Sequence, residues 1–156
     1  SAERELSRIG AKPNTYVYTA WATMEYKKGS VSSSSGRDDD VKSLKRAREL
    51  YKKALDADPH CSVAYLQLGV MESAEGNYDR AKECFEKVLT FDQRNSRVLQ
   101  AYAIMESRRE EENVNSRRVL DLFERALKAN PRDAGVYQAY GLYVEELGDV
   151  ESARDL

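Results

Sequence analysis

Three glutamates, Glu25, Glu72 and Glu106, each follow a methionine at a matching place in the sequence. Carboxylates commonly serve in general acid–base catalysis and metal binding, so these three are the first candidates for chemistry. They stand 47 and 34 positions apart, however, in separate segments that share one apolar pattern. No second acid or base accompanies any of them, so the catalytic interpretation lacks a partner.

A carboxylate on an apolar helix face is costly unless a cation or a hydrogen-bond donor pairs with it. Arg48 and Lys82 are the nearest basic candidates, because each stands one position after a small core residue. We expect Glu25 to pair with Arg48 inside one helix pair. We expect Glu72 to pair with Lys82, or with a nearby backbone or tyrosine donor. These pairs would be structural.

The other reactive side chains assemble no site. The one histidine, His60, stands beside a proline in a turn, and Cys61 and Cys84 lack metal-ligand spacing. Aspartates occupy positions 38–40, but three adjacent acids lack the spacing and the glycine of a calcium loop, so we favour helix capping. No phosphate loop and no nucleophile–base set is present. We therefore expect no enzyme activity, no cofactor and no metal.

The elements that carry these residues are predicted to be helices in antiparallel pairs. In the clearest pair, a first apolar stripe turns at Gly76 into a second stripe with spacings of four and three. Its members are Tyr65, Leu68, Gly69, Glu72, Ala81, Phe85 and Val88. The first-helix pattern recurs at Tyr18, Trp21, Ala22 and Glu25, at Leu99, Tyr102, Ala103 and Glu106, and at Tyr137, Tyr140, Gly141 and Val144. The second-helix pattern recurs at Ala47, Tyr51 and Ala54, and at Val119, Phe123 and Ala126.

A helix–turn–helix period of about 34 is typical of an α-solenoid, so the predicted fold class is all-α, without strands. We expect one array over residues 1–156. Its parts are the last helix of a preceding repeat at 1–10, a repeat at 14–59 with a disordered insertion at about 30–38, repeats at 62–95 and 96–131, and a truncated repeat at 133–156. The chain is thus expected to be a fragment of a longer array.

Several boundaries follow from this pattern. The first helix should stop at Gly29, the helix that begins at residue 96 should run on to residue 112, and the last repeat should turn at residues 148–149. Four small residues are expected where the first helix of each pair presses on the second, at Ala22, Gly69, Ala103 and Gly141. The aromatic residues of the pattern, Tyr137 and Tyr140 included, are expected to be core.

Composition sets limits on function. The chain has 156 residues, of which 41% are apolar and 33% charged, and its net charge is −2. No apolar run approaches the roughly 20 residues that would span a bilayer. Bulk charge gives no attraction to nucleic acid, so any such binding must come from a local stripe.

The pattern resembles the tetratricopeptide repeat, and more closely its half-a-tetratricopeptide (HAT) variant. The HAT features are Trp21 followed by Glu25, Tyr102 followed by Glu106, and Ala47-Arg48 opening a second helix that ends near Pro59. Two positions depart from it, since the fourth repeat has Val144 in place of the glutamate and the third has Leu120 in place of the base.

The resemblance implies RNA processing, and is greatest to the chloroplast HAT factors that stabilise transcripts by binding their 5′ regions. It implies single-stranded RNA on the concave face, and a chloroplast stroma location, with the nucleus as the alternative. The candidate RNA-binding residues are Lys27, Lys28, Arg97, Gln100, Arg108 and Arg109. Thr19, Thr23 and Tyr26 are expected on the same face in the first repeat. The fourth repeat has Glu145 and Glu146 there, which suits phosphate poorly.

The alternative is a protein-interaction scaffold of an RNA-processing complex, such as one for splicing or 3′-end formation. It would bind a peptide or dimerise, for example through its repeat ends. Val63, Leu66 and Val70 would give the second repeat an apolar groove suited to a helix. One continuous basic stripe would favour RNA, whereas dispersed bases beside an apolar patch would favour protein.

Overall fold

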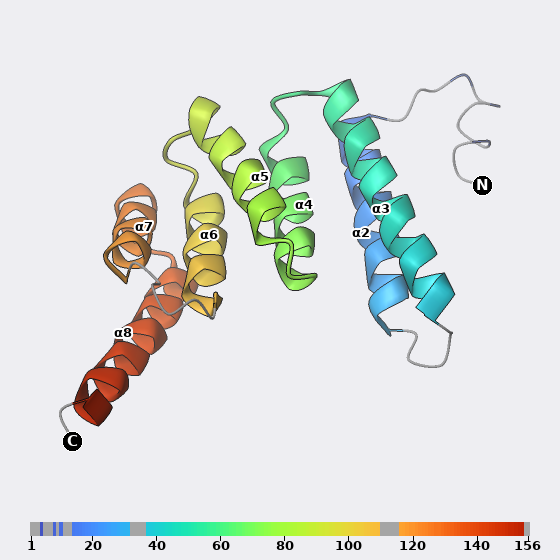
Figure 1. Cartoon of the computed structure of the whole chain (residues 1–156). Coiled ribbons are helices and arrows are strands. Elements are labelled where there is room, and N and C mark those ends of the chain that lie inside the picture. The colour runs from blue at the N-terminus through green and yellow to red at the C-terminus, as the bar shows by residue number, and fades with distance from the viewer. Residues whose placement is uncertain are drawn as a thin grey trace. The chain divides into compact units, whose positions relative to one another are not determined.

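The computed structural model describes residues 14–31, 37–109 and 116–154, together with Arg4, Arg8 and Gly10. Within these ranges every regular element is an α-helix and no strand occurs (Figure 1). The chain divides into two compact units, Ser1–Cys84 and Phe85–Leu156. The division falls inside α5 (Tyr78–Phe91).

Unit 1 is built on a long helix pair, α2 (Thr15–Val31) and α3 (Arg37–Ala57), which lie side by side and antiparallel (Figure 1). The shorter α4 (Ser62–Ala74) packs against both. The core of unit 1 contains two clusters of buried residues. The first is made of Ala22, Ala47, Tyr51 and Met71, and the second of Ala54, Cys61 and Ala64. The small residues let the helices approach closely, and Tyr51 fills the space between them.

The predicted stop at Gly29 is wrong, because α2 continues through it to Val31. A Cβ atom added at Gly29 would lie 2.9 Å from the Cβ of Ser43 on α3. Gly29 is therefore a point of close helix–helix approach. Helix also extends into both ends of the predicted insertion at 30–38, and residues 32–36 lie outside the described ranges. The predicted helix at 1–10 is described only at Arg4 and Arg8, which are helical, and at Gly10.

The aspartates at positions 38–40 lie in the first turn of α3, not before it. Their charges still face the positive end of the helix dipole, which is the favourable arrangement.

Unit 2 contains the end of α5 together with α6 (Ser96–Arg108), α7 (Ser116–Ala129) and α8 (Ala134–Arg154). Asn95 caps α6 by accepting a hydrogen bond from the Val98 backbone N–H at 3.1 Å. Asp133 caps α8 in the same way, accepting from Gly135 at 3.0 Å. The largest fully buried side chains of this unit are Phe85, Phe123, Leu99, Met105, Val88, Val98, Val119 and Val136.

Two aromatic pairs of unit 2 repeat with the same offset. The rings of Phe85 and Tyr102 have centroids 5.7 Å apart, and those of Phe123 and Tyr140, each 38 positions later, are 5.4 Å apart. In each pair the phenylalanine belongs to a second helix of the pattern and the tyrosine to the helix that follows. The aromatic stripe thus joins successive helices. Tyr102 is buried as predicted, whereas Tyr140 is only half-buried.

The end of α6 differs from the prediction. The helix ends at Arg108, and Arg109 has the extended dihedral angles φ −67° and ψ 119°, so the expected run to residue 112 is wrong. The three glutamates at 110–112 would have placed negative charge at the negative end of the helix dipole, which disfavours extension.

The last repeat differs most from the prediction. α8 is one continuous helix through Gly148, without the predicted turn at 148–149. A single glycine inside a helix costs only about 1 kcal/mol. The neighbouring glutamates and leucine are good helix formers, so the helix continues through this position. Val136 and Tyr143 are buried, but Tyr137 is 53% exposed and Gly141 meets no atom within 4 Å of an added Cβ. The predictions that Tyr137 is core and that Gly141 is a contact are therefore wrong, whereas Ala22, Gly69 and Ala103 are buried as predicted.

Candidate functional site

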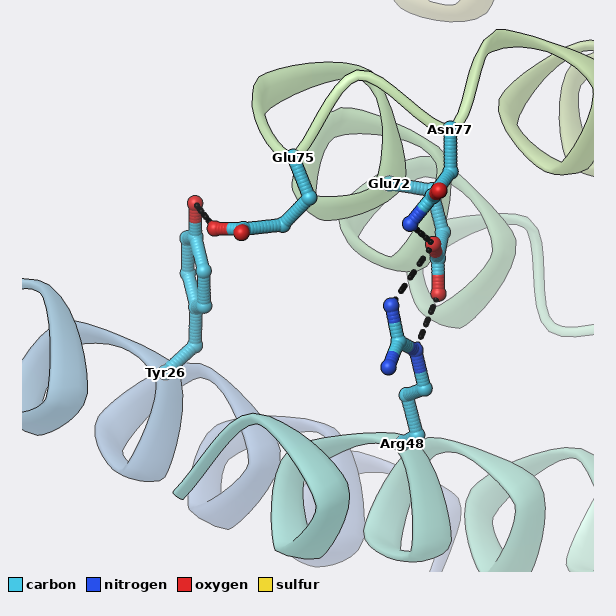
Figure 2. Close-up of polar contacts among 5 residues, drawn as sticks. All are labelled: Tyr26, Arg48, Glu72, Glu75 and Asn77. Atoms are coloured by element: carbon cyan, nitrogen blue, oxygen red, sulfur yellow. Dashed lines mark hydrogen bonds and ion pairs between the residues drawn. The ribbon is translucent and has the colours of Figure 1, made fainter. Parts of the chain in front are cut away.

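The most developed polar contact of unit 1 joins Arg48 to Glu72 (Figure 2). Arg48 Nε donates to Glu72 Oε1 at 2.6 Å, and Arg48 Nη2 donates to Glu72 Oε2 at 3.1 Å. Asn77, in the turn after α4, adds a donor to Oε2 at 2.8 Å. Glu72 is only 3% exposed, so three donor contacts offset the cost of burying its charge.

This arrangement corrects the predicted pairs. Arg48 binds the glutamate of the next repeat and not Glu25, and Asn77 is a donor that the sequence interpretation missed. The first helix of the next repeat packs on α3, so the bridge lies between repeats. A signal was present in the sequence, because Asn77 follows the turn glycine only five positions after Glu72.

The titration of both partners reflects the contact. Burial alone would raise the pKa of Glu72, but the hydrogen bonds from Arg48 and Asn77 and the charge of Arg48 together lower it below its ordinary value. The hydrogen bond to Glu72 raises the pKa of Arg48. Glu72 is thus held ionised and paired, which is the opposite of what a proton-transferring carboxylate near neutral pH requires.

A second contact lies beside the first. Tyr26 Oη donates to Glu75 Oε1 at 3.2 Å (Figure 2). Both residues line an open hollow of about 300 Å³. Burial and the neighbouring Glu75 charge raise the pKa of Tyr26. The other residues that line this hollow are Gly29, Ser30, Asp40, Val41 and Leu44. The Ser30 hydroxyl of this lining donates to the Lys27 carbonyl at 3.1 Å.

In unit 2 the corresponding polar group is Tyr102. Its hydroxyl donates to Glu86 Oε1 at 3.0 Å and accepts from Arg118 Nη2, which also reaches Glu86 at 3.4 Å. Burial first, and then the hydrogen bond to Glu86, raise the pKa of Tyr102. Sequence reasoning identified Tyr102 but missed both charged partners. They could have been found as neighbours of core positions, since Glu86 follows Phe85 and Arg118 precedes Val119.

The predicted RNA-binding residues are divided between the two units. Lys27 and Lys28 are exposed near the end of α2 in unit 1, whereas Arg97 and Arg108 are exposed near opposite ends of α6 in unit 2. Eleven positions of helix separate the two arginines, which is roughly 16 Å. Within each unit, these residues form no continuous basic stripe.

Two further candidates are engaged elsewhere. Arg109 lies 3.5 Å from the buried Glu106, so its charge is paired inside the protein. Gln100 is half-buried, and its Nε2 lies 3.2 Å from where a Cβ atom on Gly135 would sit. Thr19, also expected on the groove, is buried and donates to the Thr15 carbonyl at 2.7 Å, so it cannot line an open surface.

The apolar stripe of α4 is open. Val63 and Val70 are 43% and 44% exposed, and Leu66 between them is half-buried. A neighbouring side of α4 carries Ala64 and Met71, which are buried in the core of unit 1. α4 therefore has two apolar faces, of which only one is used inside the unit.

The remaining chemical candidates are unreactive in character. Cys61 and Cys84 are free and buried, and burial raises the pKa of Cys84 to about 12. Among the described residues no group of three histidine, cysteine or acidic side chains could hold a metal ion. The helices of the described ranges include none that is long and apolar enough to cross a membrane.

Comparison with known proteins supports the repeat architecture. Residues 40–104 match the tetratricopeptide repeat family, a range that includes all of α4 and α5 and most of α3 and α6. Among curated proteins, no significant match is found. The chain is therefore similar to repeat proteins of the tetratricopeptide type, and its fold class is an all-α solenoid of antiparallel helix pairs. Repeats of this type are typically non-catalytic scaffolds for protein or RNA partners.

Proposed function

We propose that this protein is a protein-interaction scaffold whose α4 holds an apolar segment of a partner. The observation that carries the proposal is the exposure of Val63 and Val70 on a helix whose other face is already in the core. Apolar side chains at spacings of three and four receive a helical partner well, because they form a continuous stripe along one side of the helix.

The distribution of charge supports the same function. The net charge is −2, and the exposed bases Lys27, Lys28, Arg97 and Arg108 are dispersed over the two units. A single strand of RNA needs a groove in which positive charge follows the backbone, together with aromatic platforms for the bases. The exposed apolar stripe of α4 fits a polypeptide better.

A peptide-display selection against the purified chain tests this function. We expect peptides with apolar anchors to be enriched on the wild type and lost on the variant Val70→Asp. Leu142→Asp is the matched control, since it places the same charge at an exposed apolar residue of α8. Equal enrichment on all three chains would reject the α4 face. Circular dichroism checks that the variants stay folded.

RNA binding is the second candidate, and the exposure of both Arg97 and Arg108 on one helix favours it. Under this second hypothesis the chain is a HAT array that stabilises transcripts, in the chloroplast stroma or alternatively the nucleus. Fluorescence anisotropy with short single-stranded RNA across a salt series tests it. Saturable binding, with a salt slope that Arg97→Ala and Arg108→Ala each reduce by about one phosphate contact, would favour RNA over protein.

A further inference from the structure

One face of α3 carries a dense group of exposed bases that the predicted binding residues do not include. It lies opposite the buried side of the helix, where Ala47, Tyr51 and Ala54 enter the core of unit 1. Over positions 42–53, about 16 Å of helix, this face has five bases and one acid, Glu49, a formal charge of +4 in a chain whose net charge is −2. The five bases, called the basic face below, are Lys42, Lys45, Arg46, Lys52 and Lys53.

The charge of the basic face is not neutralised by the residues that the structure describes. Among them, no carboxylate forms an ion pair with Lys42, Lys45, Arg46 or Lys52. Glu49 stands four positions from both Lys45 and Lys53, yet it forms no ion pair with either. Lys53 lies over the exposed edge of the core, with its Nζ 5.9 Å from the centroid of the Tyr18 ring. The positive charge is therefore open to an anion from outside.

Acidic residues limit the basic face in length. Positions 38–40 are aspartates in the first turn of α3, and Asp56 is exposed near the other end. Glu49 divides the bases into a group of three and a group of two, whose centres are roughly 12 Å apart along the helix. This arrangement breaks the positive charge into two short groups.

Such a surface suits a short acidic polypeptide better than a nucleic-acid strand. A strand that followed α3 would bring its regularly spaced phosphates against Glu49 and against the aspartates at both ends. The one aromatic residue of α3, Tyr51, is buried, so the face has no ring on which a nucleic-acid base could stack. A polypeptide can carry uncharged residues opposite Glu49 and end before the aspartates.

We propose that the basic face of α3 binds an acidic segment of a partner protein, whose carboxylates form two groups with centres about four residues apart in an extended chain. Four extended residues span about 13 Å, which matches the separation of the two groups of bases. Complementary charge of this kind sets the register of a contact and speeds its formation. The basic face is on a different helix from the α4 stripe and does not depend on the function proposed above.

The test titrates the synthetic peptide Glu-Glu-Ser-Ser-Glu-Glu into the isotope-labelled whole chain at low salt, followed by the NMR shifts of the backbone amides. We expect saturable shifts centred on the basic face, which weaken as salt is added because exposed charges are screened. The peptide Ser-Glu-Glu-Glu-Glu-Ser has the same composition but places its central acids opposite Glu49, so it should bind about threefold more weakly or worse.

Substitutions locate the charge that matters. Lys45→Glu/Arg46→Glu should weaken binding by about tenfold or more, because two attractions become repulsions. Lys45→Gln/Arg46→Gln should give an intermediate loss. The matched control, Lys87→Glu/Arg132→Glu, reverses the same number of charges at exposed bases of unit 2 and should change binding by no more than about twofold. Circular dichroism checks that each variant is folded.

Several results would overturn the proposal. They are the absence of saturable shifts, shifts centred away from α3, equal binding of the two peptides, and equal weakening by the control variant. Tighter binding of a short oligouridylate at the same face and salt would assign the face to nucleic acid instead. A wild-type dimer in light scattering that Lys45→Glu/Arg46→Glu converts to a monomer would show that a second copy of the chain is the occupant.

Discussion

Arg48 and Glu72 are 24 positions apart in the sequence, yet two nitrogen atoms of the arginine bind both oxygens of the carboxylate. The same two places in the pattern, 72 positions later, are occupied by Leu120 and Val144. The two charged residue types of this junction are thus apolar at the matching places of the last repeat. Such exchanges are well tolerated when both partners change together.

Removal of one partner should therefore cost more than replacement of both. We expect Arg48→Leu to lower the free energy of unfolding by about 2 kcal/mol, because Glu72 is left buried with only Asn77 as a donor. This expected loss of stability is smaller than the loss for a fully buried ion pair, because Arg48 is partly exposed to water. The double variant Arg48→Leu/Glu72→Val should return to within about 1 kcal/mol of the wild type. Urea unfolding of the four chains gives this cycle, and simple additivity of the two single changes would contradict it.

The lowered pKa of Glu72 also makes the contribution of the pair depend on pH. A carboxyl group whose folded pKa lies below its unfolded value of about 4.5 stabilises the fold above that value. This contribution is lost as the pH falls through the folded pKa. The stability difference between the wild type and Glu72→Gln should thus be constant near neutral pH and shrink below about pH 4.5. Unfolding in urea at several pH values measures it, with the exposed Glu49→Gln as a control for the loss of one charge.

The two cysteines should be protected in the folded protein. Burial raises the pKa of Cys84 from 9.0 to about 12, which lowers the thiolate fraction near pH 8 by about three orders of magnitude. Cys61 is equally enclosed, at 5% exposure. We expect a thiol reagent to react with both only as fast as the protein opens, and rapidly in urea. Fast reaction of Cys84→Ser in the native state would assign an accessible thiol to Cys61 and contradict the packing.

The substitution of glycine by alanine should change stability in opposite directions at Gly29 and Gly148. Gly29→Ala should destabilise by about 1 to 3 kcal/mol, because the new methyl group would meet Ser43 of α3 at a distance that forces the helices apart. Gly148→Ala places its methyl group in open space and should stabilise α8 by about 0.5 to 1 kcal/mol through helix propensity. Thermal unfolding of both variants checks the pair. A stable Gly29→Ala would mean that the helices are not in close contact there.

The sequence predicted the helices best where both the stripe and its end signals are local. The repeat expected at 62–95, with its turn at Gly76, is observed as two helices, Ser62–Ala74 and Tyr78–Phe91, on either side of that glycine. Gly29 misled the prediction because a glycine that ends a helix and a glycine that admits a neighbouring helix look alike in sequence. The distinction depends on Ser43, which lies on another helix.

The partners within the site were harder to predict for a related reason. A repeated glutamate can pair with the base of its own repeat or with that of the preceding one, and both choices satisfy the spacing. The packing of α4 on α3 selects Arg48 for Glu72, and this is a tertiary choice. In α8 the pattern again gave the right stripe, but only the surrounding helices decide whether Tyr137 is buried.

The ring pairs Phe85–Tyr102 and Phe123–Tyr140 bear on how the protein loses its structure. In a linear array each repeat contacts only the neighbouring repeats, so stability is a sum of local terms and nearest-neighbour couplings. Each ring pair is one such coupling. Amide exchange in α8 should therefore follow the opening of α7, and truncation of Phe123 would let the last helix fluctuate independently while the Phe85–Tyr102 coupling persists.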